Sequence, residues 1–348
     1  MGFFRKLIKN LLPYYAIKKY RVYKGGKVIS RDYDSIKSQI EEIKNQNNNL
    51  LAEIAHINNW MRNEQIKPSW ISLYESDLSF APGGFYSPIP SIQEIYRYDF
   101  NSLLPDELPG IDLNVNKQLN LLESFEPLYK ELPFPEEKSE GFRYYYVNGF
   151  YSYSDAILLY CMIRHLNPKK IIEIGSGFSS CVTLDTNEIF MKNSINCTFI
   201  EPYPERLESL LKKDDNATIY KKRLQEMPIE IFEELAKDDI LFIDSTHVAK
   251  FNSDVNFVIH KILPVLANGV YIHFHDVFYP FEYPNEWLLE GRAWNEQYIL
   301  RAFLEYNNDF EIVLFNTYLE NKYEKDIKKR FPLLYKNTGS SIWIKKIP

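Results

Sequence analysis

The chain has few cysteines and no long apolar run. Its 348 residues include only Cys161, Cys181 and Cys197, whose separations fit neither a disulfide framework nor a zinc site. No stretch approaches the roughly 20 consecutive apolar residues that a membrane-spanning helix needs. Hydrophobic residues nevertheless make up 45% of the chain, enough for a substantial folded core. We therefore expect a folded protein of the reducing cytoplasm.

Acidic residues are absent from the first 31 positions. Segment 1–31 carries nine Lys or Arg residues, whereas the remainder carries 32 basic and 47 acidic residues, a net charge of −15. Apolar residues recur at helical spacing from Phe3 to Leu12, opposite a basic side, until Pro13. Such a basic amphipathic helix suits the anionic inner face of a membrane, and docking on the protein's own core is the equal alternative. Nucleic acid is not an expected partner, because the rest of the chain is acidic.

Residues 32–67 contain a heptad repeat. Apolar side chains recur at alternating steps of four and three, with Asn47 at one seam position, at Ile36, Ile40, Ile43, Leu50, Ile54, Ile57 and Met61. This seam is typical of a coiled coil, in which a buried Asn fixes register and partner number. A homo-oligomer formed through residues 36–61 is favoured over an amphipathic helix packed on its own domain.

Residues 68–150 show no regular alternation of strand and helix patterns. Prolines and aromatic residues dominate there, and we interpret this region as a cap that contributes to substrate binding. From 151 to 348 strand and helix patterns alternate, with strands expected at 170–174, 197–201, 217–220, 239–243, 269–274, 310–318 and 340–347. Five successive βα units predict a parallel sheet, and the closing pair predicts an antiparallel end. Ligands of such sheets bind beyond the carboxyl ends of the strands.

The first of these strands ends in a glycine turn that lacks the third glycine of a dinucleotide fingerprint. Gly175 and Gly177 are one residue apart, and Ser180 stands where the third glycine is expected. Glu173 adds a negative charge that disfavours a pyrophosphate, while Glu201 at the next strand end can bind a ribose diol. S-adenosylmethionine has a ribose, a positive sulfonium and no phosphate, so it is favoured over a turn without a ligand. We expect a side chain at Gly175 to fill ligand space without unfolding the protein.

Candidate catalytic residues follow the fourth and fifth strands. Asp244 and His247 follow the fourth strand, while His275 and Asp276 follow at the end of the fifth. Adjacent parallel strands would bring these groups together. Two carboxylates with neutral imidazoles can hold a hard divalent cation such as Mg²⁺, or a carboxylate can orient a histidine that takes a proton. His273 is expected to be a core residue instead.

An aromatic and charged loop, 278–297, follows the fifth strand at the ligand-binding end. Trp287 and Trp294 can stack on a sugar or an aromatic ring, and Glu290 and Arg292 offer polar anchors for an acceptor. The alternative is a structural loop in which Glu290 and Arg292 pair with each other.

At these residues the chain resembles the class I S-adenosylmethionine-dependent methyltransferases, and within them a bacterial group whose fourth and fifth strands end in Asp-Ser-Thr-His and His-Phe-His-Asp. The resemblance implies a Rossmann-like α/β fold with a seven-stranded, mostly parallel sheet and an antiparallel last strand, here preceded by an N-terminal helical arm. It implies that the cofactor is bound by Glu173, Gly175, Ser176, Gly177, Glu201, Leu224, Gln225 and Asp244. Related oxygen methyltransferases hold a metal with two acids and an amide, which makes Asp244 and Asp276 the metal candidates, with no third ligand identifiable.

The function that we expect is methylation of a hydroxyl on a sugar or glycan, in surface polysaccharide or secondary-metabolite biosynthesis. An alcohol is a poor nucleophile until its proton leaves, and neutral imidazole suits that proton transfer near pH 7. We expect His247 to be the base, because its loop position makes it reachable by an acceptor, with His275 orienting Asp276 or helping to hold a metal. The alternatives are an NAD-dependent oxidoreductase and a non-catalytic oligomeric scaffold with a vestigial cofactor site.

Overall fold

The computed structural model describes residues 83–98, 104–215 and 217–348. The basic segment 1–31 and the heptad repeat of 32–67 lie outside these residues, so the membrane and oligomer expectations remain predictions. Within the described ranges, no helix combines the length and apolar character that crossing a bilayer requires.

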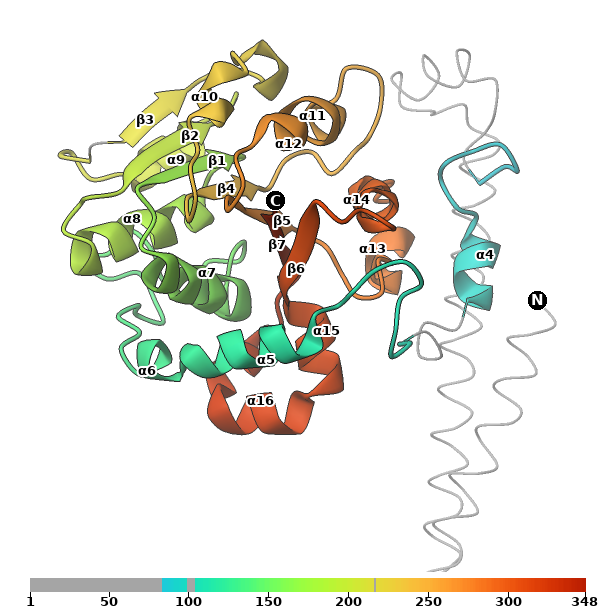
Figure 1. Cartoon of the computed structure of the whole chain (residues 1–348), viewed down its shortest axis with the longest axis horizontal. Helices are drawn as coiled ribbons and strands as arrows, with labels where there is room; N and C mark the ends of the chain where they lie inside the picture. Colours follow the sequence, from blue (N-terminus) through green and yellow to red (C-terminus); the bar gives the residue numbers. More distant parts are fainter. Residues whose placement is uncertain (1–82, 99–103, 216) are drawn as a thin grey trace, which may run out of the picture. The chain divides into compact units, whose positions relative to one another are not determined.

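A seven-stranded sheet forms the centre of the unit that spans residues 82–348 (Figure 1). Its strands occur in the order β3-β2-β1-β4-β5-β7-β6. Their bounds are Lys170–Ile174 for β1, Asn196–Ile200 for β2, Ala217–Tyr220 for β3, Ile240–Ile243 for β4, Tyr271–His275 for β5, Phe310–Phe315 for β6 and Ser341–Lys346 for β7. Strands β1 to β5 pair in parallel, and β7 lies antiparallel between β5 and β6. The predicted Rossmann-like sheet with an antiparallel last strand is confirmed.

The central strands form because their apolar residues are buried on both faces, as expected for parallel strands covered by helices. All four residues of β4 are buried, and so are four of the five in β1. Ile174 pairs with Ile243, which in turn pairs with Phe274. The residues that follow these three positions therefore emerge side by side at one edge of the sheet.

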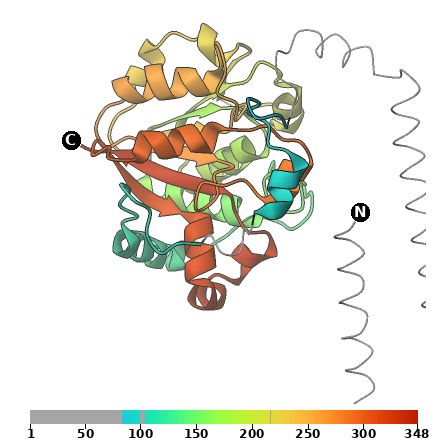
Figure 2. The same ribbon diagram turned by 90° about the vertical axis from the view of Figure 1, so that its right-hand side faces the viewer.

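Helices cover both faces of the sheet (Figures 1 and 2). Helices α7 and α8 pack on each other on one face, while α11 and α12 lie on the opposite face. The α-helices are α4 (Ile92–Arg97), α5 (Val115–Ser124), α6 (Glu126–Tyr129), α7 (Tyr153–Leu166), α8 (Phe178–Phe190), α9 (Glu205–Leu210), α10 (Glu230–Glu233), α11 (Asp254–Phe257), α12 (Leu263–Val265), α13 (Asn285–Leu289), α14 (Glu296–Leu304), α15 (Asn316–Lys322) and α16 (Glu324–Arg330). Shorter helical turns are η2 (Leu224–Glu226), η3 (Val258–Ile262) and η4 (Pro332–Lys336).

The region between 104 and 150 shares the core of the sheet domain. Leu122 and Phe125 are buried in the same apolar cluster as the central strands. Gln118 ties α5 to the sheet, because its side chain accepts a hydrogen bond from the backbone N–H of Phe315. Of the aromatic residues near 150, Tyr144 and Tyr151 are buried, whereas Phe150 is 63% exposed. This region therefore anchors on the sheet and leaves one aromatic ring at its end open to solvent.

Candidate active site

The glycine turn after β1 is shaped by close contact between two strand ends. Gly175 has a φ of +77°, and a Cβ atom there would lie 1.7 Å from the carbonyl oxygen of Asp244. Only glycine fits this backbone position. Gly177 differs, because its φ of 175° is ordinary extended backbone and a Cβ there would meet only Arg206 Cδ at 3.5 Å. The expectation that a side chain at Gly175 would leave the fold intact is therefore wrong: the clash is with the protein's own main chain.

Glu173 is a fully buried carboxyl that faces the start of α8. The hydroxyls of Ser179 and Ser180 donate hydrogen bonds to its Oε1 at 2.6 and 2.8 Å. Burial raises the pKa of Glu173 to about 8, although both serine hydrogen bonds oppose the shift. Ser180 therefore binds this acid at the position where a dinucleotide fold would place its third glycine.

A first cavity of about 430 Å³ opens beyond β1, β2 and β4. Glu201 lines it and accepts hydrogen bonds from the backbone N–H groups of Ser176 at 3.2 Å and Tyr203 at 2.8 Å. Leu224 and Gln225 line the same cavity, as the cofactor assignment predicts. We call it the adenosine cavity, because an acid that could bind a ribose faces an apolar wall suited to a base.

A second cavity, also of about 430 Å³, adjoins the first. We call it the reaction cavity. Both cavities are lined by Asp244, Ser245 and Thr246, so they meet at the end of β4. The hydroxyls of Ser176 and Ser245 are buried there without a hydrogen-bond partner among the described residues. Buried unpaired hydroxyls are uncommon in folded proteins.

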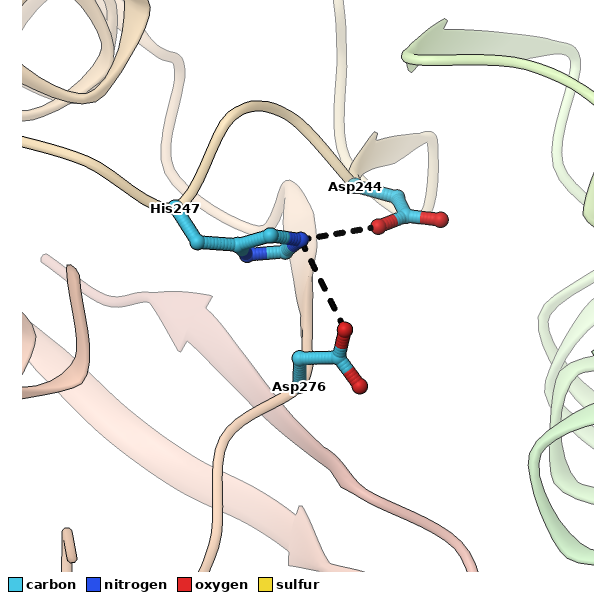
Figure 3. A group of neighbouring side chains, drawn as sticks. All are labelled: Asp244, His247 and Asp276. Atoms are coloured by element: carbon cyan, nitrogen blue, oxygen red, sulfur yellow. Dashed lines mark ion pairs between the residues drawn. The ribbon is translucent and has the colours of Figure 1, made fainter. Parts of the chain in front are cut away.

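Asp244, His247 and Asp276 converge in the reaction cavity, and Figure 3 shows their side chains pointing toward one another. His247 Nε2 lies 3.2 Å from Asp244 Oδ1 and 3.6 Å from Asp276 Oδ2. His247 and Asp276 both have positive φ values, 59° and 56°. Non-glycine residues in this left-handed region are uncommon and collect at functional sites, where the surrounding contacts hold them.

His247 is buried, which differs from the open loop position expected from the sequence. Its Nδ1 lies 2.8 Å from Glu296 Oε2, so both ring nitrogens face carboxylates. Burial alone would lower the pKa of this imidazole, but Asp244 and Glu296 raise it to about 10. In this geometry His247 holds its proton at pH 7, so it does not start as the neutral base that the sequence suggested.

His275 also lies among carboxylates. Its Nδ1 is 3.4 Å from Asp276 and 3.5 Å from Asp244, and its Nε2 is 3.5 Å from Asp155. Burial opposes the charged form, yet the three carboxylates hold the pKa of His275 well above its ordinary value. His273, by contrast, is fully buried and stacks on Phe242 with ring centroids 4.1 Å apart, which confirms the prediction of a core residue.

The loop beyond β5 contributes one of its predicted residues to the reaction cavity. Trp294 lines the cavity and stands over His247, with ring centroids 4.4 Å apart. Trp287, Glu290 and Arg292 are not among the cavity-lining residues. Arg292 pairs with Glu290 at 2.9 Å and places its guanidinium 4.1 Å from the centre of the Trp287 ring. The pair between Glu290 and Arg292 that a structural loop would contain is therefore present, while Trp294 lines the cavity as a ligand-binding residue would.

The three converging side chains also fit a divalent cation. Asp244, His247 and Asp276 each offer one ligand atom, and these atoms all lie within 4.8 Å of one another. Two carboxylate oxygens and one imidazole nitrogen suit Mg²⁺ or Mn²⁺. His247 is thus the third ligand candidate that the sequence pattern did not identify.

Two site residues had no signal in the sequence. Glu296, which contacts His247, lies 49 positions further along the chain at the start of α14. Asp155 begins α7 and accepts hydrogen bonds from Asn316 Nδ2 and the backbone N–H of Ser340. Ser340 Oγ in turn donates to Asp276 Oδ1 at 2.9 Å. Nothing near these residues in the sequence indicates their partners; only the folded sheet brings them to the site.

The chain is similar to several known proteins. Residues 172–277 match the model of a family described as a methyltransferase domain. An uncharacterised protein of Archaeoglobus fulgidus is 36% identical over 167 residues, which cover 46% of this chain and 76% of that protein. Similar solved structures include an SAH-bound methyltransferase of Podospora anserina, 14% identical, with a TM-score of 0.39 and coverage of 70% of this chain and 100% of that one. The plantazolicin methyltransferase BamL is 14% identical, with a TM-score of 0.35 and coverage of 74% and 94%.

Proposed function

Since this chain belongs to the class I S-adenosylmethionine-dependent methyltransferases, we propose that it transfers the methyl group to a hydroxyl oxygen. The observation that carries the proposal is the convergence of Asp244, His247 and Asp276 in the reaction cavity, directly beside the adenosine cavity. A hydroxyl needs a group that accepts its proton as the new bond forms, and the ionised carboxylates of this cluster supply one.

The residues of the two cavities have separate roles in the reaction. Glu201 binds the ribose, while Leu224 and Gln225 hold the adenine. The methyl group then lies near Asp244, one of the three residues that line both cavities. The acceptor oxygen forms a bond to the methyl carbon as the carbon–sulfur bond breaks, and S-adenosylhomocysteine leaves. Holding the two reactants in line accounts for most of the acceleration, roughly 7–11 kcal/mol.

The hydroxyl proton passes to an ionised carboxylate of the cluster, Asp244 or Asp276, because His247 and His275 already hold their protons. Burial would raise the pKa of Asp244, but His275 and His247 hold it well below its usual range, so this carboxylate is ionised at neutral pH. Asp244, His247 and Asp276 would hold a divalent cation, which when bound supplies Lewis acidity that lowers the pKa of a nearby hydroxyl. Occupation of the imidazole by a metal requires loss of the His247 proton, so cation binding is expected to weaken as pH falls.

We propose a sugar or glycan as the acceptor, in surface polysaccharide or secondary-metabolite biosynthesis. Trp294 and the exposed ring of Phe150 line the reaction cavity together with the carboxylates. Aromatic rings can stack on the apolar face of a sugar, while carboxylates accept hydrogen bonds from its hydroxyls. An NAD-dependent oxidoreductase is not favoured, because Ser180 replaces the third glycine of the dinucleotide fingerprint and its hydroxyl is bonded to Glu173.

Metal binding can be tested without knowing the acceptor. We expect Mn²⁺ to bind the wild-type protein in calorimetric titration, and His247→Ala to weaken that binding by at least tenfold through loss of one ligand. His260→Ala is the matched control, because His260 is exposed on η3 outside both cavities. Equal Mn²⁺ affinity in all three proteins would contradict the metal assignment. Turnover that is abolished by EDTA and restored by Mg²⁺ would link the cation to transfer, once an acceptor is found.

The N-terminal segments give two further proposals from sequence alone. The heptad of 36–61 would join copies of the chain, and the basic segment 1–31 would bind the anionic inner face of a membrane. Each basic residue near such a surface contributes on the order of 1 kcal/mol, so liposome binding should require anionic lipid and weaken with salt. Binding that is insensitive to salt, or absent, would contradict the membrane proposal.

A further inference from the structure

Arg206 is an arginine at the edge of the reaction cavity whose charge is not matched by an acid. It lies on α9, one helical turn beyond the ribose acid Glu201, and it lines the reaction cavity. Among the residues that the structure describes, no carboxylate lies within ion-pair distance of its guanidinium. Five other arginines of this unit are paired with acids, namely Arg143, Arg164, Arg292, Arg301 and Arg330.

Two neighbours fix where the Arg206 side chain lies. Its guanidinium carbon is 4.0 Å from the centre of the Phe150 ring, and Phe150 stacks on Phe178 at 5.9 Å. Its Cδ packs where a Cβ of Gly177 would lie, at 3.5 Å. An arginine stacked on an aromatic face keeps the N–H groups along its edge free to donate. Arg206 is thus held against the glycine turn with its hydrogen-bonding edge unused.

The reaction cavity is lined by charges of both signs. The carboxylates of Asp244 and Asp276 follow strands β4 and β5, whereas Arg206 comes from α9 and packs against the glycine turn after β1. A ligand in this cavity therefore meets both the acids at the strand ends and a cation without an acid partner among the described residues.

We propose that Arg206 is the carboxylate-binding group of the reaction cavity. The planar guanidinium donates two parallel N–H groups to a carboxylate, a geometry that an ammonium cannot reproduce. The inference rests on the proposed function, which supplies two sources of a carboxylate: the methionine tail of the cofactor and an acidic acceptor such as a uronic acid. We assign the cofactor's tail as the first candidate, because Arg206 packs against Gly177 in the turn that follows β1.

Calorimetric titration of the full chain tests this role in two arms. In the first arm, S-adenosylhomocysteine is compared with 5′-methylthioadenosine, which has the same adenosine but no amino-acid tail. In the second arm, the protein saturated with S-adenosylhomocysteine is titrated with glucuronate and with glucose. The variants are Arg206→Gln, Arg206→Lys and the control Arg223→Gln. Arg223 also lacks an acid partner among the described residues but lines the adenosine cavity.

We expect Arg206→Gln to weaken S-adenosylhomocysteine binding on the order of 10- to 100-fold, the range for loss of a charge-assisted hydrogen bond, and to leave 5′-methylthioadenosine binding unchanged. Arg206→Lys should recover part of the loss, and Arg223→Gln should leave the ratio of the two affinities as in the wild type. If Arg206→Gln weakens only the binding of glucuronate, the carboxylate subsite is supported and belongs to the acceptor.

The outcomes that overturn the inference are distinct from failure of the proposed function. Arg206 binds no carboxylate, and only supports the fold around Phe150, in either of two cases. In the first, Arg206→Gln leaves the affinities for S-adenosylhomocysteine and glucuronate unchanged. In the second, it weakens the binding of S-adenosylhomocysteine and 5′-methylthioadenosine equally. If the wild-type chain binds neither adenosine compound, the proposed function itself is contradicted.

Discussion

The two glycines of the turn after β1 provide a sharp test of how the site is built, because they are alike in sequence and different in structure. Replacing Gly175 by alanine places a Cβ 1.7 Å from the carbonyl oxygen of Asp244, at a φ of +77°. The left-handed backbone costs a side-chain-bearing residue roughly 1–2 kcal/mol. Relief of the overlap by movement of the main chain costs about 1–3 kcal/mol more, the usual range for overpacking. Gly175→Ala should therefore lower the free energy of unfolding by about 2–5 kcal/mol.

Gly177→Ala is the matched control. Its φ of 175° suits any residue, and the nearest atom to the new Cβ is 3.5 Å away, at the flexible Arg206 side chain. For a domain of this size, 1 kcal/mol corresponds to roughly 2–4 °C in Tm, so Gly175→Ala should lower Tm by on the order of 10 °C. Gly177→Ala should stay within about 2 °C of the wild type.

Differential scanning calorimetry of the three proteins, with S-adenosylhomocysteine titration of each, gives the comparison. Equal Tm values for Gly175→Ala and the wild type would refute the close contact between the ends of β1 and β4. An equal decrease of Tm in both variants would show that the turn itself, rather than the contact with Asp244, determines stability.

Three other variants test separate parts of the molecule. Glu201→Ala should weaken S-adenosylhomocysteine binding by roughly 1–3 kcal/mol and should also lower Tm, because the backbone N–H groups of Ser176 and Tyr203 lose their acceptor; unaltered titration would contradict the ribose assignment. The pKa of Glu173, about 8 when folded, lies above its ordinary value of 4.5, so the native state retains a proton that the unfolded state releases. The free energy of unfolding, measured by urea titration, should therefore fall as pH rises from 4.5 to about 8. Glu173→Gln should reduce this pH dependence, and an equal pH dependence in the variant and the wild type would contradict the buried acid. Deleting residues 1–66 should lower the oligomeric order measured by light scattering, and an unchanged number of subunits would remove the coiled coil.

The sheet was predictable because its strands are encoded locally. Strand β1 occurs at the expected positions, since Ile171, Ile172 and Ile174 are apolar and β-branched, and β2 begins and ends one residue earlier than expected. The prediction failed at the end of β6, which was expected to continue to residue 318 and stops at Phe315. Asn316 begins α15 there, and its side chain bonds to Asp155 and to the backbone of Ser341. Such distant partners have no signature in the local pattern.

The sequence predicted which residues meet at the strand ends, but not how deeply they are buried or which distant side chains contact them. The alternation of strands and helices brings Asp244 and Asp276 together, as expected from adjacent parallel strands. The burial of His247 could not be read from its loop position, because it depends on Glu296 and Trp294 from a segment almost 50 residues away. The contact with Glu296 raises the pKa of that imidazole, an effect that the loop position of His247 does not indicate, and its role as base stays a prediction.

The most direct test of the account is to identify the atom that receives the methyl group. The protein is incubated with S-adenosylmethionine carrying a carbon-13 methyl and with sugars, nucleotide sugars and lipid-linked glycans, and the product methyl is identified by NMR. The account predicts a methyl bound to a hydroxyl oxygen, with loss of product for Asp276→Asn and retention for the exposed control His260→Ala. A methyl on nitrogen, carbon or sulfur, or full turnover by Asp276→Asn, would contradict the proposed reaction at Asp244, His247 and Asp276.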